Sequence, residues 1–330
     1  MGSATSTFST IFSFEKPAVP ASTPSKVFRI GTRRSALARW QAEWVATALR
    51  ANGAEVVLVP IVTRGDTNQA QPLGAIGGDG LFTKELQRAL LAEEIDLAVH
   101  SLKDLPTEHV PGLLVAATPE RAPTADALIS RGGVTLTELP TGARIGTGSL
   151  RRRAQLWHAR PDLTMHDIRG NVDTRLQKLR GGDYDALVLA EAGLTRLGLE
   201  AQITERLSTP RMLPAVGQGA LGLECREQDA ETRAALAQLN HPATHAAVLA
   251  ERALMRALAG GCLAPIAALG IVNPSGQLNL SAVVLSGDGH TRLAAEGAAP
   301  VVDADTLGRR VAAELAAAGA LELIDAVRRG

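Results

Sequence analysis

The chain has 330 residues, 45% of them hydrophobic, and its 34 basic side chains balance 34 acidic ones, so its formal net charge is zero. This balance excludes the electrostatic footprint of a general nucleic-acid or anionic-membrane binder, and an aromatic content of 3% is too low for the stacking platforms of single-strand binders. The length allows two or three domains, and the two cysteines cannot build a disulfide framework or a cysteine-based zinc site. No apolar run reaches the roughly 18 residues of a membrane span. We therefore expect a soluble, multi-domain intracellular enzyme.

The first 25 residues differ in composition from the rest of the chain. They are rich in Ser, Thr and Pro and contain one acid, Glu15, and no arginine. They lack the continuous apolar core of a secretory signal peptide, so we expect a disordered extension (1–25) on a cytoplasmic protein. Two alternatives stay open: an acid-poor, Ser- and Thr-rich leader can direct a protein to a plastid or another organelle, and Gly2 with Ser6 fits the loose myristoylation pattern.

From Lys26 onward, apolar strands alternate with helical stretches. The pattern predicts a strand at 27–30 that ends in a Gly-Thr turn, a helix through 36–49 and a second strand at 56–62. A helix at 83–94 and a strand at 96–99 follow, and this strand runs into the sequence HSLKDLP. Strand, polar turn and helix repeated in this way indicate a mostly parallel α/β sheet.

The same pattern recurs in the next block of the chain. Strands are predicted at 143–145, 163–168 and 186–189, each followed by a polar or glycine turn and a helix. We therefore expect two doubly wound lobes of similar design, one at 27–119 and one at 124–214.

The last block, 241–330, has a different pattern. A helix is predicted near 245–259, strands lie within 266–285, and an Ala-rich helix closes the chain. This block reads as a third, smaller α+β domain.

Arginines recur where the predicted strands end, which is where ligands bind in open α/β sheets. Guanidinium groups suit carboxylates because they bind them with two parallel hydrogen bonds. For any one arginine, a solvated helix face is the alternative. Their recurrence after strands of both lobes predicts a small polyanionic ligand between the lobes. The arginines concerned are Arg33, Arg34, Arg151, Arg152, Arg153, Arg169, Arg175 and Arg196.

Two further side chains are candidates for chemistry. Asp104, at the end of an apolar strand, can orient N–H groups or stabilise a developing cation, although a turn cap is an equally good interpretation. Cys262 lies in the tight loop GGCLAP, where an exposed thiol is available as a nucleophile. An inert loop thiol is the alternative for Cys262, and Cys225 reads as an ordinary half-buried position.

Other motifs are weak. The GxGxxG pattern at 217–222 lies far from any first βαβ unit and lacks the acid that a ribose contact requires, which argues against nicotinamide binding. His241 and His245 lack the glutamate of a HExxH zinc site, so we expect no metal.

Motifs spread along residues 27–330 resemble the porphobilinogen deaminase, or hydroxymethylbilane synthase, family. The matching stretches, in family order, are IGTRRSALARWQ, VTRGD, GLFTKEL, AVHSLKDLPT, GTGSLRRRAQL, IRGNVDTRL, AEAGLTRLG, LPAVGQGALGLECR and GGCLAPIA. The resemblance implies two lobes like those of periplasmic binding proteins and a third domain. It also implies that the chain returns to the first lobe near Ala220, so that lobe 1 comprises 27–119 with 220–240.

The implied reaction deaminates four porphobilinogen molecules and condenses them head to tail, after which water releases linear hydroxymethylbilane. A dipyrromethane cofactor primes the chain, and the resemblance places its thioether link on Cys262. It places the catalytic carboxylate on Asp104, which would hold pyrrole N–H groups and stabilise the cation left when ammonia departs. A monomer is expected, and the competing hypothesis is a non-catalytic, two-lobed polycarboxylate-binding protein.

The resemblance also implies a set of binding residues, and two positions depart from the family pattern. Asp79 stands where a glycine loop usually has lysine, and Gly148 stands where a serine is expected, which puts affinity in doubt. The implied carboxylate binders are Arg33, Ser35, Lys103, Thr147, Ser149, Arg151, Arg152, Arg169, Arg175 and Arg196. Ser101, Gly170, Ala190 and Gln218 are expected to line the cleft, and Phe82 to pack against a pyrrole ring.

Overall fold

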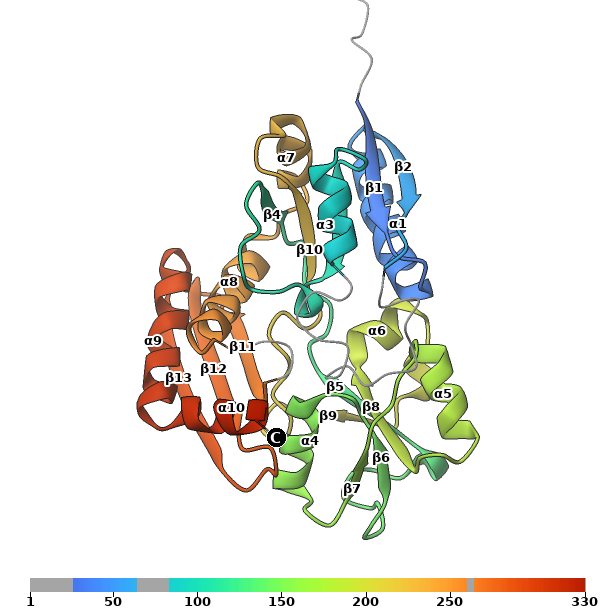
Figure 1. Cartoon of the computed structure of the whole chain (residues 1–330), viewed down its shortest axis with the longest axis vertical. Coiled ribbons are helices and arrows are strands. Elements are labelled where there is room, and N and C mark those ends of the chain that lie inside the picture. The colour runs from blue at the N-terminus through green and yellow to red at the C-terminus, as the bar shows by residue number, and fades with distance from the viewer. Residues whose placement is uncertain (1–25, 64–82, 260–263, 330) are drawn as a thin grey trace, which may run out of the picture.

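The computed structural model describes residues 26–63, 83–259 and 264–329, which form two α/β lobes and a smaller α+β domain (Figure 1). Each lobe has its own five-stranded sheet, and the third domain has a three-stranded sheet. The predicted fold class, two sheet-and-helix lobes and a smaller C-terminal domain, is therefore confirmed.

The first lobe has the strand order β2-β1-β3-β10-β4. Strands β1, β2 and β3 are parallel, whereas β10 runs antiparallel between β3 and β4. The central strand β3 is buried along most of its length, as is typical of a strand covered by helices on both faces. The elements of this lobe are β1 (Val27–Thr32), α1 (Ala36–Ala51), β2 (Glu55–Pro60), α3 (Lys84–Leu91), β3 (Leu97–Ser101), the short 3₁₀ helix η1 (Leu102–Asp104), β4 (Leu113–Ala117), β10 (Leu221–Arg226) and α7 (Ala230–Ala237).

The second lobe repeats this design with the order β7-β6-β8-β5-β9. Strands β6, β7 and β8 are parallel, and β5 is antiparallel to β8. Its elements are β5 (Asp126–Ser130), the 3₁₀ helix η2 (Arg131–Gly133), β6 (Arg144–Gly146), α4 (Leu150–Ala159), β7 (Thr164–His166), α5 (Val172–Arg180), β8 (Ala186–Ala190), α6 (Glu191–Arg196), the 3₁₀ helix η3 (Glu200–Gln202) and β9 (Glu205–Leu207).

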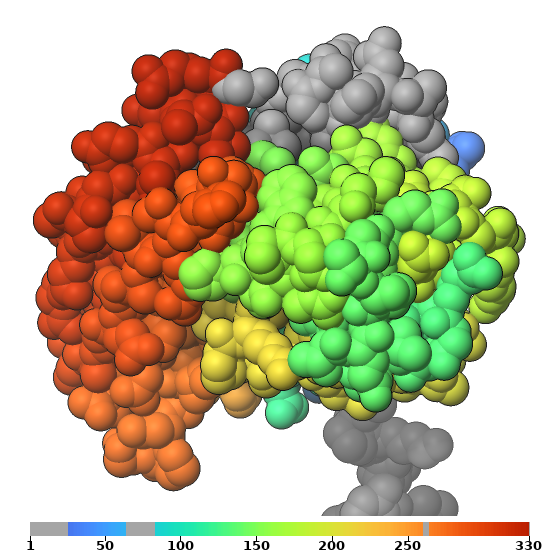
Figure 2. Space-filling model, turned by 90° about the horizontal axis from the view of Figure 1, so that it is seen from below, coloured from blue at the N-terminus to red at the C-terminus, as the bar shows by residue number. Residues whose placement is uncertain are grey.

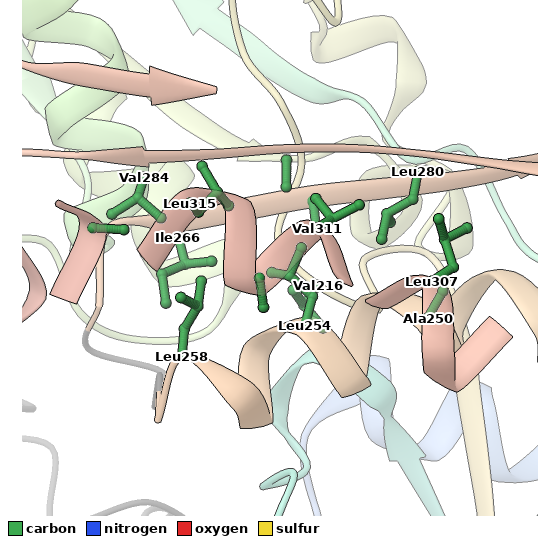
Figure 3. Close-up of a cluster of buried hydrophobic side chains, with 14 of the residues drawn as sticks. Val216, Ala250, Leu254, Leu258, Ile266, Leu280, Val284, Leu307, Val311 and Leu315 are labelled. Atoms are coloured by element: carbon green, nitrogen blue, oxygen red, sulfur yellow. The ribbon is translucent and has the colours of Figure 1, made fainter. Parts of the chain in front are cut away.

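The third domain packs helices against one face of an antiparallel sheet. Apolar side chains of α8 and α9, among them Leu254, Val311 and Leu315, meet Ile266 and Val284 of the sheet in a continuous core (Figure 3). The elements are α8 (Pro242–Ala257), β11 (Ile266–Val272), β12 (Gln277–Leu285), β13 (Arg292–Pro300), the 3₁₀ helix η4 (Val301–Asp303), α9 (Ala304–Ala317) and α10 (Ala320–Arg329).

Two features of this domain differ from the sequence-based expectation. The Ala-rich C-terminal stretch forms two helices rather than one, because the chain turns at Gly319, which has a φ of 99° that favours glycine. Strand β13 was not predicted, since its residues alternate only between exposed and half-buried and include few large apolar side chains.

The opposite face of the third sheet packs on the second lobe. Ala154 of α4 and Leu213 pack against Leu269, Val283 and other apolar residues of β11 and β12. The two units lie side by side, with the segment near residue 210 between them on the face shown in Figure 2. Helix α4, which begins with the predicted arginines, thus packs directly against the sheet of the third domain.

Two chain segments cross between the lobes: residues 118–125, between β4 and β5, and residues 208–220, between β9 and β10. A buried carboxylate of the third domain binds both of these crossing segments. Glu251 of α8 accepts two hydrogen bonds from the Arg121 guanidinium, at 2.6 and 3.0 Å, and one from the backbone amide of Gly217 at 2.7 Å. The two segments approach so closely that a Cβ on Gly219 would lie 2.4 Å from the carbonyl oxygen of Ala122. Glu251 therefore fastens the crossing point to the third domain.

Replacing Glu251 by Gln is expected to lower the free energy of unfolding by about 3–5 kcal/mol, because it leaves the Arg121 guanidinium, whose side chain is only 10% exposed, without its counter-charge. Urea denaturation measures this loss. As the control, Glu43→Gln removes an exposed ion pair with Arg50 and should cost no more than about 1 kcal/mol. Equal effects of the two variants would contradict the role given to Glu251.

Candidate active site

Asp104 lies at the end of the first sheet, where β3 turns into η1. The apolar Leu102 of this turn is buried, while Asp104 is exposed. Just before the turn, Ser101 Oγ accepts a hydrogen bond of 2.8 Å from Nε2 of Gln41 on α1. The end of β3 is thereby held against α1, with Asp104 presented beyond it.

A small cavity of about 70 Å³ opens beside this turn. Several of the predicted binding residues of lobe 1 meet in its wall. Ser35 is also the N-cap of α1, because its Oγ accepts a hydrogen bond from the amide of Ala38 at 3.3 Å. The polar side chains that line the cavity are those of Arg33, Ser35, Gln41, Thr83, His100, Ser101 and Asp104.

In the second lobe, Arg151 and Arg152 already bind a carboxylate of the protein, that of Asp126 at the start of β5. Arg151 Nη1 lies 2.7 Å from Oδ2 of Asp126, and Arg152 Nη2 lies 2.7 Å from Oδ1. Gln218 Nε2 adds a third donor at 3.1 Å, and all four side chains are buried. Arg151 Nε and Gln218 Oε1 are buried without a hydrogen-bond partner in the described structure.

Asp126 was not predicted from the sequence, although its place directly before the apolar run Ala-Leu-Ile was a usable signal. Burial alone would raise the pKa of this carboxyl, but Arg151 and Arg152 outweigh burial and hold the pKa well below its usual range. Asp126 is therefore a permanent anion between the two guanidinium groups and fixes their orientation.

The cations around this cluster outnumber the nearby carboxylates. Burial, with Arg152 adding repulsion, lowers the pKa of Lys103 to about 8. Burial and the charges of Arg152 and Arg169 lower the pKa of Arg175 to about 10, and Asp104 opposes both of these shifts. Charged side chains of the two lobes are thus close enough to shift one another's pKa values. The excess of positive charge among them favours an anionic ligand.

The turn after β7 carries Arg169, and the helix α5 that follows it carries Arg175. Arg175 Nε donates to the carbonyl oxygen of Gly170 at 2.8 Å, which joins α5 to the turn before it. Arg169 Nη2 is buried and has no partner among the described residues. An unsatisfied guanidinium N–H beside this cluster is a donor available to a bound carboxylate.

Thr147 and Ser149 precede α4. Thr147 is fully buried and its Oγ1 lies 3.3 Å from the amide of Ser149, which in turn caps α4 at the amide of Arg152. A side chain at Gly148 would place Cβ 3.2 Å from the carbonyl oxygen of Ile168, so a serine here would require the neighbouring backbone to shift by a few tenths of an ångström.

Arg196 lies where the two lobes touch. From α6, which follows Ala190, its Nη2 donates to the carbonyl oxygen of Gly219 at 2.7 Å and its guanidinium lies 5.9 Å from the ring centroid of Trp40 on α1. Burial lowers the pKa of Arg196 to about 10. Arg196 therefore contacts both the other lobe and the crossing segment.

Several predictions fall outside the described residues, namely those for Phe82, Asp79 and the cofactor cysteine Cys262. The other thiol, Cys225, is fully buried in β10 rather than half-buried, and burial raises its pKa to about 11, which makes it a poor nucleophile. Within the described residues, no group of three or more His, Cys, Asp or Glu could hold a metal ion, and no helix is long and apolar enough to cross a membrane.

Comparison with known proteins gives one consistent family. Residues 28–234 match the family model "Porphobilinogen deaminase, dipyromethane cofactor binding domain", and residues 245–317 match "Porphobilinogen deaminase, C-terminal domain". Porphobilinogen deaminase of Acidothermus cellulolyticus is 50% identical over 92% of this chain and 92% of its own length. That of Xanthomonas euvesicatoria pv. vesicatoria is 52% identical over 90% of this chain and 98% of its own.

Two of the solved structures that the chain resembles are distant in sequence. The BvgS VFT2 domain of Bordetella pertussis matches 64% of this chain and 86% of its own at 14% identity, with a TM-score of 0.40. A nutrient binding protein of Burkholderia cenocepacia matches 64% of this chain and 90% of its own at 15% identity, with a TM-score of 0.41.

Proposed function

The chain belongs to the porphobilinogen deaminase family, and from that membership we propose how its own residues carry out the family's reaction. The protein is a transferase of tetrapyrrole biosynthesis that deaminates and condenses four porphobilinogen molecules into hydroxymethylbilane, with a dipyrromethane cofactor. One observation supports our assignment of the active site: charged side chains of the two lobes act on one another. In addition to burial, Arg152 of the second lobe lowers the pKa of Lys103 in the first, and Asp104 of the first lobe opposes the lowering of the pKa of Arg175 in the second. No observation favours the non-catalytic polycarboxylate-binding alternative.

The residues of this site fit a cofactor rich in carboxylates. Burial and repulsion by neighbouring arginines destabilise the charged forms of Lys103 and Arg175, and a bound carboxylate would relieve that repulsion. The unpartnered N–H groups of Arg151 and Arg169 offer further donors. When bound, the dipyrromethane supplies the pyrrole carbon to which the first substrate is joined, and we propose Cys262 as the residue that carries it.

Asp104 is assigned as the catalytic residue. Its exposed carboxylate accepts the pyrrole N–H of the substrate and faces the positive charge that remains on that ring when ammonia leaves with the bonding electron pair. The nearby Lys103, Arg152 and Arg175 bind the acetate and propionate groups.

The remaining binding residues keep the roles that the resemblance implies. Arg196 and Gln218 line the contact between the lobes, and Phe82 is assigned to pack on a pyrrole ring. The proposed carboxylate binders are Arg33, Ser35, Lys103, Thr147, Ser149, Arg151, Arg152, Arg169, Arg175 and Arg196, with Ser101, Gly170 and Ala190 beside them. The division into 27–119 with 220–240, 124–214 and 241–330, a monomeric state and a cytoplasmic location are also proposed.

The pH dependence of turnover tests the proposed site. Burial and Arg152 lower the pKa of Lys103 to about 8 in the absence of bound carboxylates, and the cofactor carboxylates raise it again, so kcat/KM for porphobilinogen should fall at a pH above 8 as the ammonium group is lost. Lys103→Arg keeps its charge at higher pH and should move this alkaline limb upward by about one pH unit or more. The measurement is kcat/KM between pH 6.5 and 10, from the rate of tetrapyrrole formation.

Lys84→Arg is the matched control, since Lys84 is an exposed lysine at the start of α3, and its profile should equal that of the wild type. An unchanged alkaline limb in Lys103→Arg would refute the role of Lys103. Absence of any tetrapyrrole from the wild-type protein would refute the catalytic assignment itself.

A further inference from the structure

Helix α8 of the third domain packs on the back of the turn that carries Asp104. Val248 of α8 is buried together with Leu102 and Leu105, which flank the turn, and with Ala220 of the crossing segment. Arg252 follows Val248 by one helical turn and so lies on the same face of α8.

Arg252 binds the backbone of this turn directly. Its Nη1 donates to the carbonyl oxygen of Leu105 at 2.9 Å, and its Nη2 donates to that of Pro106 at 2.7 Å. One planar guanidinium thus spans two consecutive peptide groups, the first of which belongs to the residue after Asp104. Hydrogen bonds from a charged donor are stronger than neutral ones, and the fork also fixes direction.

A buried carboxylate contacts the strand that leads into this turn. Glu224 of β10 is 2.9 Å from Nε2 of His100 and 3.0 Å from Nε2 of Gln87, and all three side chains are buried. Burial would raise the pKa of Glu224, but the His100 and Gln87 contacts and the charge of Arg252 lower it. Glu224 and Arg252 therefore attract each other electrostatically.

Helix α8 is itself held in place next to Arg252. The preceding residue, Glu251, binds Arg121 and the backbone amides of Gly217 and Gly270, so this part of α8 is fixed to both crossing segments and to β11. The contact made by Arg252 thus links the Asp104 turn to a part of the third domain that is itself held in place.

We propose that Arg252 is a positioning residue for the reaction, which acts through the carbonyl groups of Leu105 and Pro106 to hold the Asp104 carboxylate at the place where substrate charge develops. This inference rests on the proposed catalytic role of Asp104. Because a displacement on the order of 1 Å can cost about 100-fold in rate, a loosened turn should affect turnover far more than substrate affinity.

The first test is Arg252→Gln, which keeps most of the side chain but cannot span both carbonyl groups. We expect kcat to fall about 30-fold and KM to change less than about threefold. Arg256→Gln is the matched control, because Arg256 lies one turn further along α8 in an exposed ion pair with Asp305, and its kcat should stay within about twofold of the wild type. Should Arg252→Gln fail to fold, Arg252→Lys serves instead, since an ammonium group binds one carbonyl oxygen but not both in a fixed plane.

A double-mutant cycle separates positioning from a purely structural role. If Arg252 acts through Asp104, adding Arg252→Gln to Asp104→Asn should reduce the residual kcat by less than about twofold. An equal loss of kcat in both backgrounds would overturn the proposal, and so would wild-type kcat in Arg252→Gln while Asp104→Asn collapses. Wild-type kcat in Asp104→Asn would instead overturn the assignment of Asp104, so the two failures are distinguishable.

Discussion

Asp104→Ala should lower kcat for porphobilinogen by about 1,000-fold or more and leave the melting temperature within about 2 °C of the wild type. The loss is large because the substituted enzyme has no anion to face the positive charge that develops on the substrate ring, and one preorganised electrostatic contact contributes about 10²–10³ in rate. The fold should survive because Asp104 is exposed and the turn is held by Leu102 and by the Arg252 contacts. Ammonia release at saturating substrate, together with a thermal melt, measures both effects.

Two variants make the interpretation of this experiment specific. Asp104→Asn preserves the shape of the side chain without its charge, so a loss equal to that of alanine shows that charge is what matters. Glu108→Ala removes an exposed acid four residues further along and should leave kcat unchanged. If Asp104→Ala turned over at the wild-type rate, the proposed mechanism would be wrong.

Cys262→Ala should abolish turnover completely and remove the cofactor from the protein. The intact mass of the wild type should exceed the polypeptide mass by two linked pyrrole units, because a thioether survives denaturation, and the variant should show the polypeptide mass alone. Incubation with porphobilinogen before a second spectrum separates an unloaded wild-type enzyme from a chain that takes up no cofactor.

The chain contains its own control for this experiment. Cys225 is the only other cysteine, it is buried in β10, and burial makes its thiol a poor nucleophile. Cys225→Ala should lose some stability because it leaves a small cavity, yet it should keep the mass increment. An increment that persists in Cys262→Ala, or that disappears in Cys225→Ala, would move the attachment site away from Cys262.

Local patterns in the sequence were sufficient for most of the fold and for part of the site. The alternation of apolar runs with helical spacing located β1, β3, β6 and β8, and each of these strands leads into a turn with predicted binding residues. Asp104 was singled out because the strand before it and the proline after it are close in sequence. Such features depend on neighbouring residues, which is why they can be predicted without a structure.

The residues that sequence reasoning missed depend on contacts between distant parts of the chain. Asp126 lies 25 residues before Arg151, and Arg252 lies about 150 residues after the turn that it binds. Nothing in the residues around either position states which partner it will meet. Their roles follow only from the crossing segments and from α8, which bring three separate stretches of chain to one place.

The position of β10 has a consequence for how the protein reaches its native state. This strand fills the gap between β3 and β4 in the first sheet, yet it is separated from β4 by the whole second lobe. During synthesis the ribosome completes the second lobe before it releases β10. The first sheet therefore lacks the strand between β3 and β4 while about 100 further residues are added. Closing such a long loop is slow, and domains that are contiguous in sequence fold as units. The second lobe should therefore acquire its structure first, and chains truncated before residue 221 should contain a folded second lobe beside an incomplete first one.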